Sequence, residues 1–569
     1  MSVGRPEVRR VMRWAAAIVA VAVLLDTAWT PSDAASKNAS HIDPALLAQA
    51  KAHPNSLFDV IVEATSLKTK LSSHAKADNA DRAGLAAIRA AGTPHRALGI
   101  VGGASATLRG GQLLGLSRDP DVAYIYADVG LSAKFDPQAG AAAVTGAGTR
   151  EVNAPAAWTT YGVTGRGVGV AIVDSGIYAH PDLAGRIVAS VDFTTATGGA
   201  NTSGDPGGHG THVAGLVAGD GTASAGAFTG VAPGANLIDV RVIDGSGASN
   251  LSTVLAGLQW VLVNRAAYNI RVVNLSLGSP EQASYLTSPL AAGVEVLAFA
   301  GVTVVVSAGN SGPGASTITM PGDDPFVITV GAIDDNGTDT LADDAAATWS
   351  SNGPTTFDRL AKPDLVAPGR RMVSLRSPGS ALDRLFPERE VTVAGASTAD
   401  YFTLSGTSMA APMVTGAVAL MLEKQPTLRP RQVKQRLVST AQPLGFGTTF
   451  TRGAGLLDAL AAVGSSDTRS WRDGSRVADG FAQMVLPLVY GQSITWESLS
   501  FNGGVDSAGV AWSSVTWDDI SWDSVTWEDI SWEDISWESV SWESVAAEDI
   551  SWEMTFEPLS GGAGWTPVN

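Results

Sequence analysis

The sequence predicts an α/β fold for the larger part of this chain, a doubly wound and mainly parallel sheet with a small α/β unit before it and a Trp-repeat tail after it. Three short runs rich in β-branched residues, at 167–173, 272–277 and 302–306, suit strands that are buried on both faces. A helical pattern at 252–264 lies between the first two runs, as βαβ units require. Polar residues follow several of these runs directly, and in such sheets ligands bind beyond the carboxyl ends of the strands.

Length and composition indicate a globular protein of several units. The chain has 569 residues, which exceeds one core of ordinary size and favours roughly two to four units. The apolar fraction of 45% is that of a globular protein. There is no cysteine, so the sequence excludes disulfides, a thiol nucleophile and thiolate metal ligands.

The net charge of −18 is concentrated at the carboxyl end of the chain. Residues 477–569 contain 16 Asp and Glu and no Lys or Arg, which leaves the preceding part nearly neutral. Phosphate contacts need basic patches, so this distribution argues against a nucleic-acid partner.

The first 35 residues have the order of a secretory signal peptide. Four arginines, at positions 5, 9, 10 and 13, precede an apolar run over residues 14–25, and small residues follow at 34–36. The apolar run is short for a membrane span, although an uncleaved N-terminal anchor is the alternative. We therefore expect an extracellular protein, either secreted or associated with the cell surface.

Residues 36–149 are expected to form a small α/β unit followed by a linker. A helical pattern covers residues 80–91. Strand patterns are present at residues 57–63, 104–108 and 122–127. Residues 134–150 are rich in Ala and Gly, which favours a flexible linker that is accessible to a processing cut. An unrelated N-terminal domain is the alternative for this unit.

Three short segments, far apart in the chain, supply an acid, a base and a nucleophile. Asp174 stands in VAIVDSG, His209 in GHGTHVAG and Ser408 in GTSMAAP. A fourth segment, SAGNSG, contains Asn310. An acid, a base and a serine, together with a separate amide donor, are the groups that acyl transfer requires.

The residues around these four positions suit the same chemistry. Ser408 precedes an apolar helical stretch at 409–421, so its own backbone N–H would face a developing oxyanion at the positive helix end. Asp174 would hold one tautomer of His209 and stabilise its imidazolium form. The side-chain amide of Asn310 would be the second oxyanion donor.

Each of these residues also has a simpler interpretation when it is taken alone. Ser408 could cap a buried helix, and His209 could be a histidine satisfied within the core. Asp174 could open an Asx turn, and Asn310 could be a turn residue between glycines. The presence of all four segments in one chain argues against this simpler set of roles.

The four segments and their order resemble those of the subtilisin-like serine proteases, the subtilases. The resemblance covers roughly residues 155–460 and includes a softer match, TGVAP, at 229–233. It implies a subtilisin-like peptidase domain at 150–464, in a secreted serine endopeptidase that hydrolyses protein or peptide substrates through an acyl-enzyme. The unit at 36–149 resembles the family's propeptide. This implies a self-processed precursor whose propeptide is an intramolecular inhibitor.

The resemblance also implies the substrate-binding residues. Two backbone segments would flank the specificity pocket and pair with an extended peptide: Ser276, Leu277, Gly278, Ala308 and Gly309. Residues 319–322 would form the base of the pocket, where Thr319 would make it shallower than a glycine would. No acidic residue is evident at that base, which favours cleavage after apolar residues. Ordinary turns at strand ends are the alternative for these small residues.

The resemblance implies no required cofactor and leaves calcium open. Asp182 matches a position at which many subtilases bind calcium, but the loop that begins at residues 219–222 lacks the family's Asn-containing pattern. A surface Asp without a metal is the alternative. His212 lies about one helical turn from His209 and is expected to be structural, since no third ligand is apparent for a metal.

The acidic C-terminal region, residues 465–569, contains a Trp repeat. From about residue 512 onward Trp recurs every five residues, and nine Trp lie between positions 496 and 552. A period of five fits neither one helix face nor one strand face. Three interpretations stay open, namely a stacked β-structure, a module that binds a surface or a flat ligand, and a disordered acidic-aromatic segment. The rival to an enzyme is a non-catalytic surface protein that presents this tail.

Overall fold

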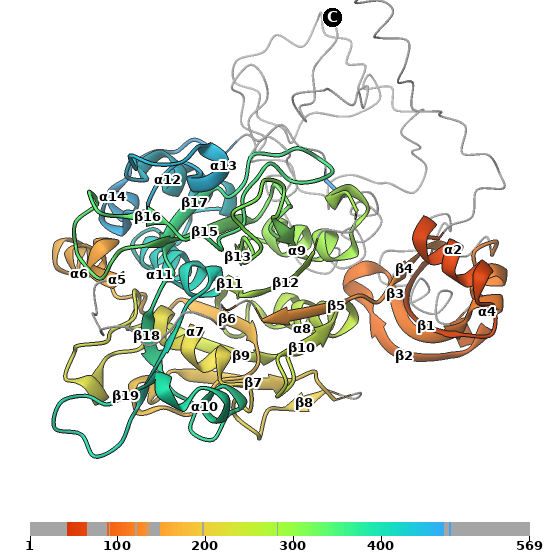
Figure 1. The fold of residues 1–569 in the computed structure, drawn as a ribbon, viewed down its shortest axis with the longest axis horizontal. Coiled ribbons are helices and arrows are strands. Elements are labelled where there is room, and N and C mark those ends of the chain that lie inside the picture. Colours follow the sequence, from red (N-terminus) through yellow and green to blue (C-terminus); the bar gives the residue numbers. More distant parts are fainter. Residues whose placement is uncertain are drawn as a thin grey trace, which may run out of the picture.

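A computed structural model describes most of the chain (Figure 1), at residues 42–64, 88–89, 91–119, 122–133, 135, 148–195, 198–280, 283–471 and 477–478. The signal peptide predicted at 1–35, most of the helix predicted at 80–91 and the Trp repeat all lie outside these residues. Within the described residues, no helix combines the length and the apolar character needed to cross a bilayer.

A nine-stranded sheet forms the centre of the larger part, in the order β16-β15-β13-β11-β6-β9-β7-β8, with β17 also paired to β15. All pairs are parallel except those made by β8 and β16 at the two edges. The mainly parallel α/β sheet predicted from the sequence is thereby confirmed. Its strands are β6 (Gly169–Asp174), β7 (Ile187–Asp192), β8 (Gly199–Ala200), β9 (Asn236–Arg241), β11 (Ile270–Leu275), β13 (Thr303–Ser307), β15 (Ile328–Asp334), β16 (Ala345–Ala346) and β17 (Leu365–Pro368).

Helices cover both faces of this sheet, and the side chains of each strand alternate between them. In β6, Val170 and Ile172 belong to one buried cluster, whereas Ala171 and Val173 belong to the other. Strands that are buried on both faces therefore lack polar alternation. The second cluster is covered by α8 (Leu251–Asn264) and α9 (Pro289–Phe299). The first is covered by α6 (Ala154–Tyr161), α7 (His209–Ala218), α11 (Thr407–Lys424), α12 (Pro430–Thr440) and α14 (Ala459–Gly464).

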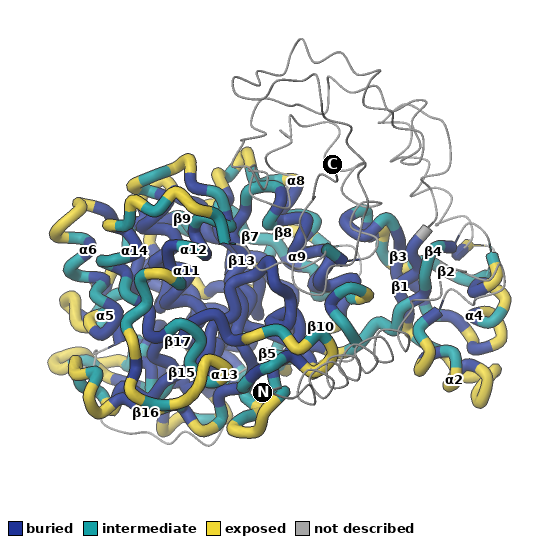
Figure 2. Tube along the Cα trace, turned by 90° about the horizontal axis from the view of Figure 1, so that it is seen from above, coloured by how far each residue is buried: buried dark blue, intermediate teal, exposed yellow. Residues whose placement is uncertain are grey.

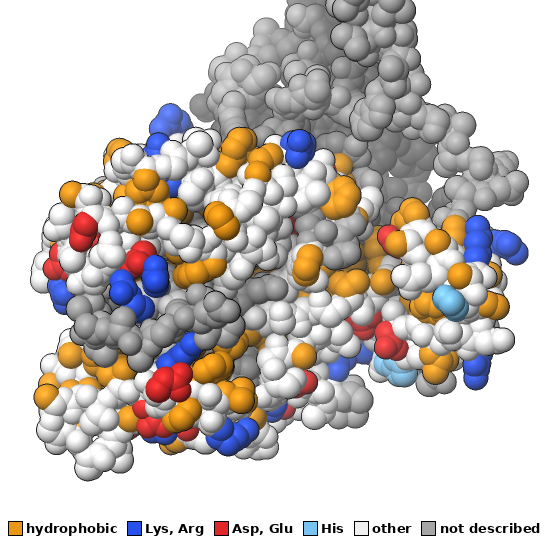
Figure 3. Space-filling view, in the orientation of Figure 1, with side chains coloured by type: hydrophobic (Ala, Val, Ile, Leu, Met, Phe, Trp, Pro, Cys, Tyr) orange, Lys and Arg blue, Asp and Glu red, His pale blue; other side chains and the backbone are white. Residues whose placement is uncertain are grey.

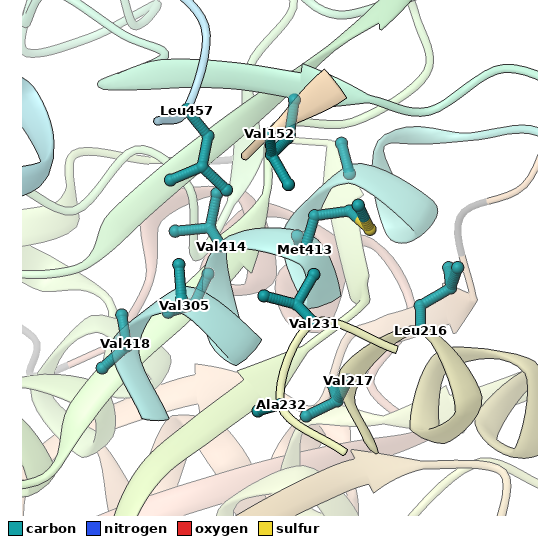
Figure 4. Packing of buried hydrophobic residues seen from close by; sticks show 14 of the residues in the cluster. Val152, Leu216, Val217, Val231, Ala232, Val305, Met413, Val414, Val418 and Leu457 are labelled. Carbon is teal, nitrogen blue, oxygen red and sulfur yellow. The ribbon is translucent and has the colours of Figure 1, made fainter. Parts of the chain in front are cut away.

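Helix α11 runs through the first cluster and is buried along nearly its whole length. Its residues 407–422 are all buried, and Met413, Val414 and Val418 pack near Val305 of β13 and Val231 (Figure 4). In Figure 2 the sheet and α11 form the dark interior, and the exposed segments lie at the periphery. A helix held on all sides in this way fixes the position of its first turn, where Ser408 lies.

The N-terminal unit is a four-stranded antiparallel sheet, in the order β2-β3-β1-β4, with helices on one face. Its core joins residues from both layers, including Leu46, Val60, Leu113 and Ile125. The strands predicted at 57–63, 104–108 and 122–127 correspond to β1, β3 and β4. The elements are α2 (Pro44–Ala52), β1 (Leu57–Ala64), β2 (Thr93–Leu98), η2 (Gly99–Val101), β3 (Gly103–Arg109), α4 (Gly110–Leu116) and β4 (Val122–Ala127).

A small second sheet connects the N-terminal unit to the larger part of the chain, which contains the nine-stranded sheet. Its order is β10-β5-β12-β14, and β5 comes from the segment that follows the N-terminal unit. Its strands are β5 (Gly130–Ala133), β10 (Ala248–Asn250), β12 (Leu277–Pro280) and β14 (Thr319–Met320). In Figure 1, β5 extends from the N-terminal unit to a place beside β10 and β12.

The remaining elements lie around the edges of the larger part. A third sheet has the order β18-β20-β19. Residues 148–150, which the sequence predicted as linker, belong to a short helix whose first and last residues are buried. These elements are α5 (Gly148–Glu151), η3 (Pro181–Leu183), η4 (Thr222–Ser224), η5 (Tyr285–Thr287), β18 (Met372–Leu375), α10 (Ala381–Leu385), η6 (Pro387–Arg389), β19 (Glu390–Val391), β20 (Tyr401–Leu404) and α13 (Thr449–Arg452).

Candidate active site

The acid and the base predicted from the sequence are hydrogen-bonded to each other. Asp174 is the last residue of β6 and His209 the first residue of α7, and Asp174 Oδ1 lies 2.8 Å from His209 Nδ1. Both side chains are buried. A Cβ at Gly210 would lie 2.2 Å from the carbonyl oxygen of Gly176. Helix α7 therefore approaches the end of β6 this closely because residue 210 has no side chain.

The neighbouring carboxylates set the protonation of His209. Burial by itself lowers the pKa of this imidazole, because it disfavours the charged form. The charge and hydrogen bond of Asp174 raise the pKa, and Asp205 adds to this effect. The net result is a pKa of His209 above its usual value.

Asp205 holds the loop that presents His209, although no sequence motif identifies it. Its carboxylate accepts hydrogen bonds from the Ser175 hydroxyl (2.8 Å), from Gly208 N (2.7 Å) and from both the backbone and the hydroxyl of Thr211. The Ser175 oxygen in turn accepts from Gly210 N at 2.9 Å. These bonds tie the residue after Asp174 to the residues on both sides of His209.

Ser408 lies in the first turn of α11, close to the end of β11. Its hydroxyl donates to the carbonyl oxygen of Ser276 at 3.1 Å, and no hydrogen bond joins it to His209. His209 Nε2 is buried and has no hydrogen-bond partner among the described residues. The base therefore has a free lone pair, and rotation about one side-chain bond redirects the hydroxyl of Ser408.

A buried chain of hydrogen bonds fixes the backbone at Ser408. The Ser276 hydroxyl donates to the carbonyl oxygen of Ser408 at 3.0 Å and accepts from Asn274 Nδ2 at 2.9 Å. The hydroxyl of Thr415 donates to Asn274 Oδ1 at 2.8 Å. Strand β11 and helix α11 are thereby connected beneath the serine by Ser276, which the sequence analysis singled out for another role, and by Asn274 and Thr415, which it did not.

Asn310 presents its amide nitrogen without a partner. Its Oδ1 accepts hydrogen bonds from the backbone N–H (3.0 Å) and the hydroxyl (2.9 Å) of Thr407, the residue before Ser408. Its Nδ2 is buried and has no hydrogen-bond partner among the described residues. An orphaned donor held in this way is what an oxyanion site requires. The sequence motif gave no indication of Thr407 as the residue that orients the amide.

The five predicted substrate-binding residues fall into two groups. Leu277 and Gly278 belong to β12 and pair antiparallel with Ala133 and Ser132 of β5, and Ser276 immediately precedes them. Ala308 and Gly309 follow β13, on the other side of the pocket, and do not pair with β5.

Thr319 lies close to residues of both groups. The carbonyl oxygen of Ala308 accepts a hydrogen bond from Thr319 N at 3.0 Å. A Cβ placed on Gly278 or on Gly309 would come within 3 Å of Thr319 side-chain atoms. The two glycines therefore lie close to this threonine, and the shallow pocket base stays a prediction.

The surroundings of Asp182 do not fit a calcium ligand. Its carboxylate is completely buried and accepts hydrogen bonds from Ala223 N (2.7 Å) and from the Tyr401 hydroxyl (2.6 Å). The guanidinium of Arg186 donates to the carbonyl oxygens of Asp182 and Ala218. The positively charged side chain of Arg186 thus binds the two backbone carbonyl oxygens beside Asp182. Asp182 is also not the surface residue that the sequence offered as the alternative, and calcium binding by the chain stays untested.

His212 forms hydrogen bonds with backbone carbonyl oxygens. Its Nε2 lies 3.1 Å from the carbonyl oxygens of both Met372 and Phe402, and burial lowers its pKa to about 3. A neutral histidine that donates to carbonyls is structural, as the sequence predicted. The described residues contain no group of three or more His, Asp or Glu side chains arranged to hold a metal ion.

The comparison with known families agrees with this geometry. The model of the Subtilase family (peptidase S8) matches residues 165–457, a little over half of the chain. The chain belongs to the subtilase family. All four catalytic motifs lie within the matched residues, and the protein is a subtilisin-like serine peptidase.

This subtilase is also similar to individual proteins of the family. It is 43% identical over 314 residues to serine protease AprX of Bacillus subtilis (strain 168), which covers 53% of this chain and 67% of AprX. It is 34% identical over 367 residues to subtilisin NAT of Bacillus subtilis subsp. natto, which covers 64% of this chain and 81% of that protein.

The fold has a match among solved structures. Fervidolysin from Fervidobacterium pennivorans, a keratinolytic enzyme related to subtilisin, superposes with a TM-score of 0.54 at 23% identity. The match covers 73% of this chain and 62% of fervidolysin. At this identity the likeness supports the fold alone.

Proposed function

We propose that this subtilase is a secreted endopeptidase, made as a precursor that cuts itself and is then inhibited by its own N-terminal unit. The observation that carries this proposal is the position of β5. This strand of the chain's own N-terminal part lies between β10 and β12, where an extended substrate would pair.

The roles of the catalytic residues follow from their contacts. Ser408 rotates away from the Ser276 carbonyl and attacks the peptide carbon while His209 Nε2 takes its proton. Asp174 holds the other ring nitrogen and stabilises the imidazolium. The free amide of Asn310 and the backbone N–H of Ser408 donate to the oxyanion. His209 then gives its proton to the leaving amine, and water releases the acyl group.

The self-processing site lies on the amino side of Phe135. Ala133 N donates to the Gly247 carbonyl at 3.2 Å, and Ala133 pairs with Leu277. The residue before Leu277 is Ser276, whose carbonyl oxygen accepts from the Ser408 hydroxyl. The ring of Phe135 lies 6.3 Å from the ring of His209. Because Ala133 and Phe135 both lie near catalytic residues, we take the bond before Phe135 as the one that is cut.

This position requires no strong preference for the residue that precedes the cut. The sequence analysis favoured cleavage after apolar residues, whereas the residue before Phe135 in the sequence is Lys134. An intramolecular cut proceeds at an effective concentration far above that of a free peptide. Self-processing can thus occur at a bond that the enzyme would cleave slowly in another protein.

The contacts of the N-terminal unit support its role as an inhibitor. Ile61, Leu98 and Ile100 belong to the same buried cluster as α8 and α9 of the peptidase. Asp128 accepts hydrogen bonds from the backbone N–H (2.8 Å) and the hydroxyl (2.7 Å) of Ser252 at the start of α8. A cut beside Phe135 leaves these contacts intact, so the unit would keep covering the cleft.

The proposal is tested with casein and two proteins, wild type and Ser408→Ala, both produced from residue 36. We expect the wild type to degrade casein after a lag, during which the bound N-terminal unit is lost. The Ser408→Ala protein should leave casein intact. Equal degradation by both proteins would refute the assigned nucleophile. Secretion is tested separately, by expressing the full chain and searching the culture medium for a product that lacks residues 1–35.

A further inference from the structure

We infer that the leaving side of the cleft carries an aromatic subsite, formed by Phe386 and the outer face of His209. This subsite would make the enzyme favour bonds that are followed by an aromatic residue. The inference rests on the proposed function, since it takes Phe135 as the residue that follows the scissile bond.

Phe135 contacts two rings on the peptidase. Its ring centroid lies 6.3 Å from that of Phe386 at an interplanar angle of 77°, which is an edge-to-face pair. The centroid of the Phe135 ring also lies 6.3 Å from that of the His209 ring, at an interplanar angle of 44°. Phe135 and Phe386 are both partly buried against the first core cluster. The side chain after the proposed cut therefore sits in an apolar aromatic environment.

Phe386 comes from a segment that is anchored beside the catalytic histidine. Helix α10 ends at Leu385, and Phe386 N donates to the Leu382 carbonyl at 3.0 Å. At the other end of the helix, Ala381 N donates to Pro206 O (2.8 Å) and Leu382 N to Gly207 O (3.1 Å). These two carbonyls belong to the loop that precedes His209, so the helix and the histidine are held at a fixed spacing.

Charged residues lie beside the Phe386 ring and also hold the segment from which it comes. The Arg389 guanidinium lies 4.4 Å from the centre of this ring, within the range of a cation–π contact. Arg376 makes ion pairs with Asp383 of α10 (2.5 Å) and with Glu390 (2.7 Å). Figure 3 shows charged side chains of both signs next to apolar ones over α10. A ring that is fixed before the substrate binds does not lose rotational freedom when the substrate packs on it.

The two sides of the cleft would then contribute differently to specificity. On the side before the cut, Thr319 lies close to Gly278 and Gly309. On the leaving side, the partly buried ring of Phe386 offers an edge-to-face partner. One such aromatic pair corresponds to roughly 2- to 13-fold in kcat/KM.

The test uses processed enzyme and a series of quenched fluorescent peptides that differ only in the residue after the scissile bond, with Phe, Leu or Ala there. Product masses identify the bond that is cut. For wild type we expect kcat/KM for the Phe peptide to exceed that for the similarly apolar Leu peptide by roughly 2- to 13-fold, and that for the Ala peptide by more. In Phe386→Ala the ratio of the Phe to the Leu peptide should fall towards one, and in Phe386→Tyr it should be retained.

The matched control is Leu385→Ala, because Leu385 is the neighbouring residue of α10 and its side chain is 68% exposed. It should keep the wild-type ratio. A wild type without any preference for Phe, or a Phe386→Ala ratio equal to that of wild type, would overturn the inference. Failure of the proposed function gives a different result, namely that wild type cuts none of the peptides or that Ser408→Ala cuts them equally well.

Discussion

At the scale of single residues, the candidate active site contains two side chains that each have one polar atom without a hydrogen-bond partner. His209 Nε2 and Asn310 Nδ2 are both buried and have no hydrogen-bond partner among the described residues. Their other polar atoms are held firmly, by Asp174 in one case and by Thr407 in the other. A buried polar atom without a partner is costly in the resting protein. It is useful only if the reaction supplies the missing partner.

The unpaired amide leads to a prediction for Asn310. Replacement by Ala or Leu should lower kcat by about 10²–10³, the range known for this donor in subtilisin, because the oxyanion loses one hydrogen bond. The melting temperature should change little, since the hydrogen bonds of the lost side chain within the described part of the chain all go to Thr407. Steady-state kinetics on a quenched peptide would measure the effect. Unchanged turnover in both variants would contradict the role given to Asn310.

The protonation of His209 gives the pH dependence. The base must be neutral to accept the serine proton, so activity is present above its pKa and lost as the pH falls through it. Burial lowers this pKa, but the carboxylates of Asp174 and Asp205 raise it more, so it lies above the usual value of about 6.5. A profile of kcat/KM against pH should therefore decline on acidification with an apparent pKa above about 6.5. A flat profile down to about pH 4 would exclude His209 as the base.

The sequence reveals the candidate reacting residues and not those that orient them. Asp174, His209, Ser408 and Asn310 lie in short motifs with a characteristic chemistry. Asp205 is joined to Ser175, which lies 30 positions away, and Thr407 is joined to the side chain of Asn310, which lies 97 positions away. No local pattern distinguishes such residues from ordinary loop or helix positions.

At the scale of the elements, the strands of the N-terminal unit differ in how far they could be predicted. β1 and β4 are rich in Val, Ile and Tyr, and β3 contains a Thr and a Leu at its end, so the sequence predicts all three as strands. β2 contains Pro94, His95 and Arg96, and it lies at the edge of the sheet, where a proline is tolerated. β5 has only four residues and exists because β10 and β12 pair with it on both sides. Its sequence alone suggests no strand.

One buried carboxyl makes the N-terminal unit sensitive to pH. Glu63 of β1 is 4% exposed, and burial raises its pKa to about 7, although the Tyr126 hydroxyl donates to it at 3.1 Å. The folded unit thus prefers the protonated form. The contribution of Glu63 to the free energy of unfolding is fully present below pH about 4.5. About 3 kcal/mol of this contribution is lost as the pH rises to about 7.

We therefore expect the N-terminal unit to be less stable at pH 8 than at pH 5. Hydrogen exchange of the amides of β1, corrected for the intrinsic rate and measured in the full Ser408→Ala chain, would report this difference. Glu63→Gln should abolish most of it, because the amide does not titrate. The exposed Asp59 in the same strand provides the control, and Asp59→Asn should retain the pH dependence. Equal pH dependence in Glu63→Gln and wild type would contradict this account.

At the scale of the whole molecule, the mainly parallel sheet with its helices could be predicted because its buried strands are short runs of Val, Ile and Leu. The run predicted at 272–277 divides into β11 and β12 at Ser276, where the chain leaves the large sheet to bind β5. A break of this kind depends on the partner strand, which the run itself does not reveal.

We propose that the chain lies across its own catalytic residues in the position of a substrate, and the intact masses of wild type and Ser408→Ala, both produced from residue 36, would report the resulting cut. Wild type should yield an N-terminal fragment ending at Lys134 and a product beginning at Phe135, whereas Ser408→Ala should remain one chain. A wild-type product that begins elsewhere, or the same cut in Ser408→Ala, would refute this position of the chain.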